Sequence, residues 1–203
     1  IALTTNSTGA ANTAVGRSAL AANTTAADNT AVGYISLGSN TTGAACTAVG
    51  KSALAANTTG SDNIAVGHIC LGSNTTGASN TAVGYTALSA NTTAVDNTAV
   101  GHRALVANTT ASYNTSVGSA SLAANTTGNE NCAFGYGALK ANTTGVQNTA
   151  VGLNAGDSLT TGEKNTLIGY GADTGDGADS DNEIVIGAHN AGAGTTYASL
   201  GYD

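Results

Sequence analysis

Asn12-Thr13-Ala14-Val15-Gly16 is the first of ten copies of one pattern, and successive copies lie 17 residues apart with no insertion or deletion between them. A short and strictly fixed period is the sequence signature of a solenoid, in which each unit packs mainly on its two neighbours. We therefore expect one repeated architecture instead of separate globular domains. The later copies begin at Asn29, Cys46, Asn63, Asn80, Asn97, Asn114, Asn131, Asn148 and Asn165.

The commonest unit continues with two variable residues, Ala-Leu, two small residues and Asn-Thr-Thr-Gly. Its apolar residues form short clusters bounded by Asn, Thr and Gly, which favour strands and turns, and they lack the spacing of a helix. The pattern predicts two short strands per unit, around residues 13–15 and 19–20, with corners at Gly16 and near residues 23–25. The predicted fold class is all-β: a parallel β-solenoid of 17-residue coils, stacked about 4.8 Å apart.

Stacking turns each position of the unit into a row of identical side chains. The valine and leucine rows supply the two large apolar side chains per coil that we expect to fill the interior. Two asparagine rows can hydrogen-bond along the stack, as amides do in other cross-β structures. The rows contain Val15, Val32, Val49, Val66, Val83, Val100 and Val117; Leu20, Leu37, Leu54, Leu71, Leu88, Leu105, Leu122 and Leu139; Asn12, Asn29, Asn63, Asn80, Asn97 and Asn114, interrupted by Cys46; and Asn23, Asn40, Asn57, Asn74, Asn91 and Asn108.

The regular repeats extend over residues 1–169, and residues 170–203 are expected to form irregular closing coils. The tenth unit loses both the Ala-Leu pair and the Asn-Thr-Thr, and the segment 182–187 gains one residue before its glycine. Terminal units of solenoids are commonly atypical because they close an otherwise open end. The chain opens at Ile1 in the middle of a unit, so we expect it to be a piece of a longer protein.

The strand pattern also bears on assembly. Neighbouring residues of a strand point to opposite faces, and Ala14 and Val15 are both apolar, so neither face has the polar side chains of a solvated sheet. We expect one face to line the coil and the other to lie against another chain, in a homo-oligomer with a shared axis. The alternative is a flat, exposed alanine row.

Composition excludes several functions. The 203 residues carry a net charge of −7 with only five Lys plus Arg, which argues against nucleic acid. No run of about 18 apolar residues occurs, so no membrane insertion is expected. The scattered cysteines, Cys46, Cys70 and Cys132, are interpreted as small buried residues instead of a disulfide framework or metal site.

Catalysis is not predicted. His68, His102 and His189 are isolated, and no nucleophile, phosphate-loop or zinc motif is present, so we expect no enzyme activity, cofactor or metal. Acidic residues gather near the C-terminal end, but their spacing fits no calcium-binding pattern and predicts an exposed acidic turn. They are Asp157, Asp173, Asp176, Asp179 and Asp181.

The repeat resembles known families. Asn-Thr-Ala-Val-Gly followed by Ala-Leu is similar to the head repeats of trimeric autotransporter adhesins, although those units are usually shorter. It is more similar to the arrays of phage-type tail fibres and bacterial surface proteins, which often precede a self-cleaving chaperone domain; segments 182–187 and 192–196 resemble their closing coils. This resemblance implies a left-handed parallel β-roll that trimerises into a stiff rod for adhesion or host recognition.

The residue after each corner glycine is variable and rich in aromatic and basic side chains. Tyrosine rings stack on sugars and basic groups bind hydroxyls or acidic sugars, so this row is a candidate contact for a cell-surface glycan. The alternative is a solvated edge that keeps the rod soluble. The candidates are Arg17, Tyr34, Lys51, His68, Tyr85, His102 and Tyr136.

The Asn-Thr-Thr corners match the acceptor pattern for N-glycosylation, which would attach a row of glycans to one edge in a secretory route. In another context the same residues are turn chemistry. The threonine rows also raise ice binding as a less favoured hypothesis. The acceptor candidates are Asn23, Asn40, Asn57, Asn74, Asn91, Asn108, Asn125 and Asn142.

Together these observations predict a structural, non-enzymatic fibre or shaft segment that supports host or surface attachment. It would be extracellular, on a cell surface or on a virion, and it would form a homotrimer or other homo-oligomer. Two alternatives remain open: direct glycan binding along the tyrosine, histidine and arginine row, and a self-assembling extracellular filament.

Overall fold

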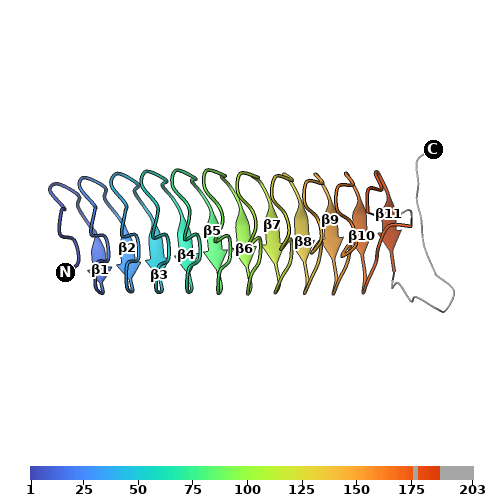
Figure 1. Ribbon diagram of the computed structural model, residues 1–203, viewed down its shortest axis with the longest axis horizontal. Coiled ribbons are helices and arrows are strands. Elements are labelled where there is room, and N and C mark those ends of the chain that lie inside the picture. Colours follow the sequence, from blue (N-terminus) through green and yellow to red (C-terminus); the bar gives the residue numbers. More distant parts are fainter. Residues whose placement is uncertain (176–177, 188–203) are drawn as a thin grey trace.

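The computed structural model describes residues 1–175 and 178–187. Over these residues the chain winds into an elongated rod of about ten coils, with the strands side by side in chain order along its length (Figure 1). Each coil contributes one strand of three residues. The strands are β1 (Thr13–Val15), β2 (Thr30–Val32), β3 (Thr47–Val49), β4 (Ile64–Val66), β5 (Thr81–Val83), β6 (Thr98–Val100), β7 (Thr115–Val117), β8 (Cys132–Phe134), β9 (Thr149–Val151), β10 (Thr166–Ile168) and β11 (Ile184–Ile186).

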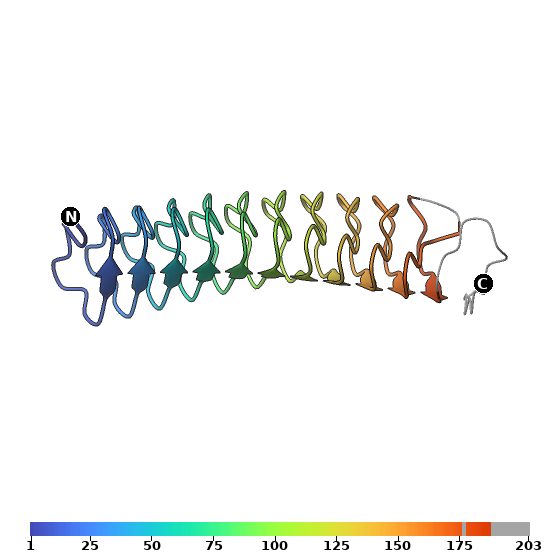
Figure 2. The ribbon, with the colours of Figure 1, turned by 90° about the horizontal axis from the view of Figure 1, so that it is seen from below.

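The predicted parallel solenoid is confirmed. Every strand pairs in parallel with the next at an unbroken register, so that Val15 lies beside Val32 and Val32 beside Val49. The strands form a single sheet along one side of the rod (Figure 2). At about 4.8 Å per step, the ten steps from β1 to β11 span about 48 Å.

The prediction of a second strand around Ala19-Leu20 is wrong. This segment forms turns, because Ser18 and Leu20 adopt left-handed backbone conformations with φ of 59° and 49°. The equivalent leucines repeat the conformation, which costs a side-chain-bearing residue roughly 1–2 kcal/mol. In return the chain bends sharply enough to place each leucine side chain fully inside the narrow coil, where its burial offsets that cost.

The expectation that valine fills the interior is also wrong. The middle residue of each strand points inward, and Ala31, Ala48 and their equivalents are completely buried. The valines face outward: Val15 is 58% exposed and Val66 is 37% exposed. In the regular coils the leucine side chain and the asparagine amides already occupy the inside, so only a small side chain, alanine or the serine of β7, fits at the centre of the strand.

The two predicted asparagine rows are confirmed, and they also close each coil. Asn63 and Asn74 are the first and twelfth residues of one unit. Both donate from Nδ2 to the backbone oxygen of Gly77, at 2.8 and 2.9 Å. This shared acceptor clasps the coil at one point. Because buried amides are costly when unpaired, this arrangement satisfies polar groups that would otherwise oppose folding.

The same amides link successive coils. In one row, Asn74 donates to Oδ1 of Asn57 at 2.8 Å, and Asn91 donates to Oδ1 of Asn74 at 2.8 Å. In the other, Asn80 accepts at Oδ1 the backbone N–H of Asn97 at 3.1 Å. A third row of threonine hydroxyls joins coils from outside, as when Thr58 donates from Oγ1 to the backbone oxygen of Thr75 at 3.0 Å. Every coil is therefore tied to the next by side chains as well as backbone.

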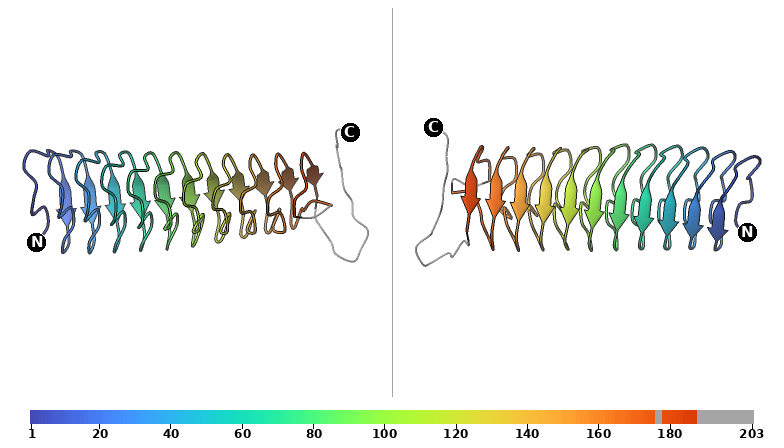
Figure 3. Two further views of the ribbon diagram at one scale, coloured as in Figure 1. Left: turned by 45° about the horizontal axis from the view of Figure 1, so that its top comes forward. Right: turned by 180° about the vertical axis from the view of Figure 1, so that it is seen from behind.

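The coil that begins at Asn148 departs from the regular unit. It carries Gly156 where the others have the buried leucine, and Leu159 where the others have the corner asparagine. The next step is 18 residues, yet β11 still joins the sheet in register (Figure 3). The sequence predicted irregular closing coils over residues 170–203. Of these, the structure describes residues 170–175 and 178–187; the rest, including the segment 192–196, lies outside the described residues.

Candidate functional site

The residue after each corner glycine projects outward because the glycine reverses the chain there. Gly16 and its equivalents have φ between 128° and 143°, a conformation open only to glycine, and a Cβ on Gly67 would approach the backbone oxygen of Gly84 to 2.4 Å. We call the residues that directly follow these glycines the edge row. They are Arg17, Tyr34, Lys51, His68, Tyr85, His102, Ser119, Tyr136, Leu153 and Tyr170, all exposed except the half-buried His68 and Ser119.

Rings of the edge row stack on one another. Tyr85 lies between His68 and His102, with ring centroids 5.5 Å apart on both sides and interplanar angles of 26° and 15°. The guanidinium carbon of Arg17 lies 5.6 Å from the ring centroid of Tyr34. The faces of Tyr85 are therefore occupied by its neighbours, and the edges of the rings and the polar groups remain for a ligand. Sugar stacking on tyrosine faces, as the sequence suggested, does not describe this stretch.

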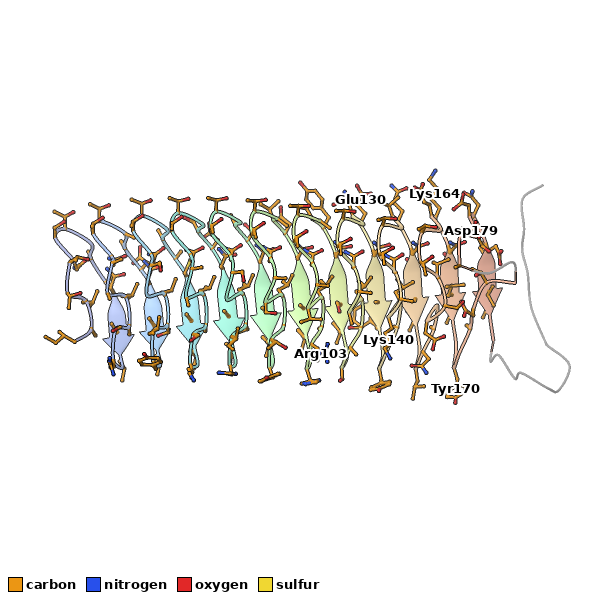
Figure 4. All side chains as sticks on the ribbon, in the orientation of Figure 1. Arg103, Glu130, Lys140, Lys164, Tyr170 and Asp179 are labelled. Carbon is orange, nitrogen blue, oxygen red and sulfur yellow. The ribbon has the colours of Figure 1, made fainter. Side chains whose placement is uncertain are left out.

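The edge row and the acidic residues lie on opposite sides of the rod. Tyr170 projects from one edge, whereas Glu130 and Lys164 project from the other (Figure 4). Glu130 accepts at Oε2 a hydrogen bond of 2.8 Å from Gln147 on the next coil. Acidic residues on that edge recur every second coil at Asp28, Asp62, Asp96 and Glu130, a spacing of about 10 Å that limits repulsion between like charges.

The glycosylation candidates lie in the interior. Asn23, Asn40, Asn57, Asn74, Asn91, Asn108, Asn125 and Asn142 are completely buried, and their Nδ2 groups donate to neighbouring carbonyls. A glycan on Nδ2 would have to replace these hydrogen bonds and would not fit inside the coil. The folded rod thus uses these residues for the corner and the ladder, the turn chemistry that the sequence left as the alternative.

The three cysteines are free thiols. Cys46 replaces an asparagine in the first ladder, and its thiol donates to the backbone oxygen of Gly60 at 3.3 Å, in the place of the missing amide. Cys70 is buried and its thiol donates to Gly67 at 3.1 Å; burial raises its pKa to about 12. Cys132 is half-buried on β8, and burial raises the pKa of its thiol as well. Burial likewise raises the pKa of the Cys46 thiol, so all three thiols stay protonated, which suits packing more than nucleophilic chemistry.

The acidic residues near the C-terminal end act locally. Asp181 accepts the backbone N–H of Glu163 at 2.7 Å, and Asp173 accepts that of Thr174 at 3.0 Å. Asp176 and His189 lie outside the described residues. Among the residues that the structure describes, no group of three or more His, Cys, Asp and Glu side chains is placed to hold a metal ion. None of that part of the chain forms a helix long and apolar enough to cross a membrane.

A second outward surface is the outer side of the sheet; the sequence predicted that one strand face would point outward, but not which residues form it. The first and third residues of β1–β11 form two parallel rows on the outer side of the sheet, which we call the sheet face. Most are threonine in the first row and valine in the second; the departures are Ile64, Cys132, Phe134, Ile168, Ile184 and Ile186. The available signal was the absence of charge at both positions in every unit.

Comparison with protein-family models, with curated proteins and with solved structures finds no match for this chain. The geometry alone establishes a β-solenoid repeat protein with 17-residue coils and asparagine ladders.

Proposed function

We propose that this chain is a shaft segment of an extracellular fibre, of the kind found in phage-type tail fibres and bacterial surface adhesins. The segment would hold an attachment module at a fixed distance from a virion or cell. The observation that carries this proposal is the unbroken linkage between coils: each is tied to the next by strand pairing, by asparagine amides and by threonine hydroxyls. A structure of this kind resists bending because a bend must break several rows together.

Two further properties support a passive role. The strand pairing and the coil register repeat at every step of the described residues, and a repeated backbone suits a spacer better than the single concave pocket that small-molecule sites usually have. In addition, the buried asparagines are engaged in hydrogen bonds within and between coils. The resemblance of the repeat to fibre arrays supports the same conclusion from the sequence.

The rod proposal is tested by changing the number of coils. Duplication of residues 63–113, which form three complete 17-residue units, should lengthen the rod by about 14 Å, at about 4.8 Å per coil. Small-angle scattering should show this increase with an unchanged cross-section. A matched duplication of residues 63–109, which is four residues shorter, should disrupt the register and lower the melting temperature. An unchanged length in the first variant would contradict a stacked shaft.

A second candidate is direct glycan binding along the edge row, which the exposed aromatic and basic side chains of that row, such as Arg17, Tyr34 and Tyr136, favour. Glycan-array binding by the isolated chain distinguishes the two functions. A shaft should give no signal above background, whereas a glycan-binding surface should give a signal that falls at least tenfold in the double variant Tyr34→Ala, Tyr85→Ala. The matched control is Tyr113→Ala, which removes an exposed tyrosine from the opposite, acidic side of the coil.

A further inference from the structure

We propose that the second threonine of each Thr-Thr corner is an acceptor for O-linked sugar, so that a row of short glycans covers one side of the rod. The sugar comes from a nucleotide-activated donor through a glycosyltransferase. This inference goes beyond the proposed shaft and does not depend on it, because coils without sugars would still form a rod. We call these residues the outer threonine row: Thr25, Thr42, Thr59, Thr76, Thr93, Thr110, Thr127, Thr144 and Thr161.

The first argument is that the fold uses one hydroxyl of each corner and leaves the other. The first threonine of the corner ties successive coils together, as when Thr41 donates from Oγ1 to the backbone oxygen of Thr58 at 2.9 Å. Its neighbour Thr42 is exposed, like every member of the outer threonine row. Within the described residues, no member of that row makes a side-chain hydrogen bond. The coils therefore do not need these hydroxyls for their own stability.

The second argument is that the chain keeps this threonine in every coil. Three residues further along, at a position that is equally exposed, successive units carry residues as different as Asp28, Ala45 and Tyr113. Even the coil with Leu159 in place of the corner asparagine has Thr161. A preference for a β-branched shape would be met equally well by valine or isoleucine. The constant feature is the hydroxyl, and we infer that it serves a molecule outside the chain.

The third argument concerns what surrounds each hydroxyl. The next residue is always glycine or alanine, and the two residues before each corner asparagine of the regular coils are small and uncharged except at Val106 and Lys140. A lone hydroxyl gains little from a hydrogen bond to a ligand, because it gives up a hydrogen bond to water in exchange. With few charged or aromatic groups beside it, this row is poorly suited to hold a ligand by non-covalent contacts. A covalent acceptor needs only access, which small neighbours provide.

The spacing of the row favours sugar over phosphate and over ice. Successive hydroxyls lie about 4.8 Å apart, the spacing of the stacked coils. Phosphates at that distance would each carry nearly two negative charges and would repel one another, whereas neutral sugars would not. An ice lattice needs hydroxyls in two dimensions. On this side of the rod the first threonines are bonded to the next coil, so the free hydroxyls form a single line.

The chemistry requires only the threonine hydroxyl and the activated donor. Oγ1 forms a bond to the anomeric carbon of the sugar, and the bond from that carbon to the donor phosphate breaks. The nucleoside diphosphate leaves, and the hydroxyl proton passes to a base of the transferase. Because the row is exposed on the folded coils, the transferase can act after the rod has formed.

Peptide mapping of the protein from the organism that makes it provides the test. Trypsin cleavage after Arg103 and Lys140 releases one peptide with two corners, Thr109-Thr110 and Thr126-Thr127. Mass spectrometry with electron-transfer fragmentation should locate sugars on Thr110 and Thr127 and none on Thr109 and Thr126. An unmodified peptide, phosphate in place of sugar, or sugar on both threonines of a corner would each overturn the proposal.

Paired variants made in the same organism separate attachment from folding. Thr110→Val with Thr127→Val should abolish the sugars on this peptide, and without sugars it should leave the melting temperature unchanged, because no hydrogen bond is lost. Thr109→Val with Thr126→Val should keep the sugars but lower the melting temperature, since each hydroxyl donates to the next coil, at 3.3 and 3.1 Å. Equal losses of stability in the two sugar-free double variants would mean that the outer hydroxyls serve the fold, and would overturn the proposal. The length of the rod tests the shaft separately.

Discussion

The regular coils and the coil that begins at Asn148 share one backbone register but fill their interiors differently. A regular coil has a fully buried leucine at its ninth position, such as Leu139, and a corner asparagine at its twelfth, such as Asn142. The later coil has Gly156 and Leu159 at those positions, so its leucine has moved by three residues. Leu167 then occupies the centre of β10, where the regular coils have alanine. A Cβ on Gly156 would lie 2.7 Å from Cδ1 of Leu167 and 2.9 Å from Cδ2 of Leu139, which explains the glycine.

This difference shows that the apolar and polar parts of the interior are constrained in different ways. Leucine can be relocated because its packing requires only that the volume be filled. The amide row cannot be relocated, because each Oδ1 needs a donor at the same position of the next coil. At Leu159 that donor is missing, and Oδ1 of Asn142 is the one buried side-chain polar atom without a partner among the described residues. The row therefore ends at Asn142, in the same coil as Leu139, the last regular leucine.

The largest expected effect comes from replacing a corner asparagine of a regular coil by leucine, the residue that the later coil has at that position. Asn74→Leu removes three hydrogen bonds of 2.8 to 2.9 Å and leaves Oδ1 of Asn57 without its donor inside the rod. We expect a loss of about 4 kcal/mol in the free energy of unfolding, from about 1 kcal/mol per bond and the cost of the unpaired oxygen. Urea denaturation measures it. Thr76→Leu, two residues away and exposed, is the control and should change stability by less than about 0.5 kcal/mol. Equal effects would show that the ladder is dispensable.

The corner glycine is common to both regions, so its substitution should be severe in either. Gly67→Ala places a Cβ where φ is 139° and the backbone of the next coil lies 2.4 Å away, and we expect a loss of about 3 kcal/mol. Gly60→Ala is the matched control: a Cβ there would also approach a backbone oxygen, that of Gly77, to 2.2 Å, but Gly60 lacks the left-handed φ, and Ala26, Ala94 and Ala111 already occupy the equivalent position. Its effect should stay below about 1 kcal/mol. A thermal melt of the two variants gives the comparison, and a tolerant Gly67 would contradict the described corner.

A smaller effect is expected from pH, within the regular array alone. The folded pKa of Cys70 is raised from 9.0 to about 12, so its contribution is fully present below pH 9 and is lost as pH rises toward 12. Between these values stability should fall by about 1 kcal/mol per pH unit, since the unfolded thiol ionises first. Cys70→Ala matches Ala53 and Ala87 of neighbouring coils and removes this dependence. The difference between the two proteins in urea denaturation at pH 8 and pH 10.5 isolates the thiol from tyrosine and lysine; parallel curves would contradict burial of Cys70.

The smallest effect concerns Cys46, which interrupts the asparagine row that begins at Asn12. Cys46→Asn should restore an amide that donates to Gly60 and an Oδ1 that accepts the backbone N–H of Asn63, as at the equivalent residues of other coils. We expect a gain of about 1 kcal/mol, the net value of a buried hydrogen bond. Differential scanning calorimetry should show a higher melting temperature. A lower one would mean that the surrounding coils have adapted to the thiol.

The period, the stacking and both asparagine rows could be predicted from sequence because each depends on the spacing of identical residues. Which strand side chains face the interior could not be predicted, since Ala14 and Val15 are both apolar and hydropathy does not distinguish inside from outside. Nor could the left-handed Leu20, because leucine rarely adopts that conformation and the sequence carries no sign of it. That conformation is what replaces the expected second strand by turns.

The candidate site was predicted in part for the same reason. The exposure of the edge row follows from the corner glycine, so Arg17 and Tyr85 were identified correctly as surface residues. Their mutual stacking depends on side-chain geometry across coils, which the sequence does not give. The Asn-Thr-Thr corners match a surface modification pattern, but burial of Asn23 and Asn40 depends on which way the corner turns. A linear motif does not contain that information.

The amides from Asn6 to Asn142 all align in one sense, each Nδ2 donating to the Oδ1 of the preceding coil, so their oxygens point toward the C-terminal end. Aligned amides polarise one another, and their dipoles add to a net dipole moment along the rod that grows with each added unit. The threonine hydroxyls donate toward the following coil, so their smaller dipoles point the opposite way. A rod built from nearly identical units thus has two electrically different ends, and a molecule that approaches it end-on meets a different electrostatic potential at the N-terminal end than at the C-terminal end.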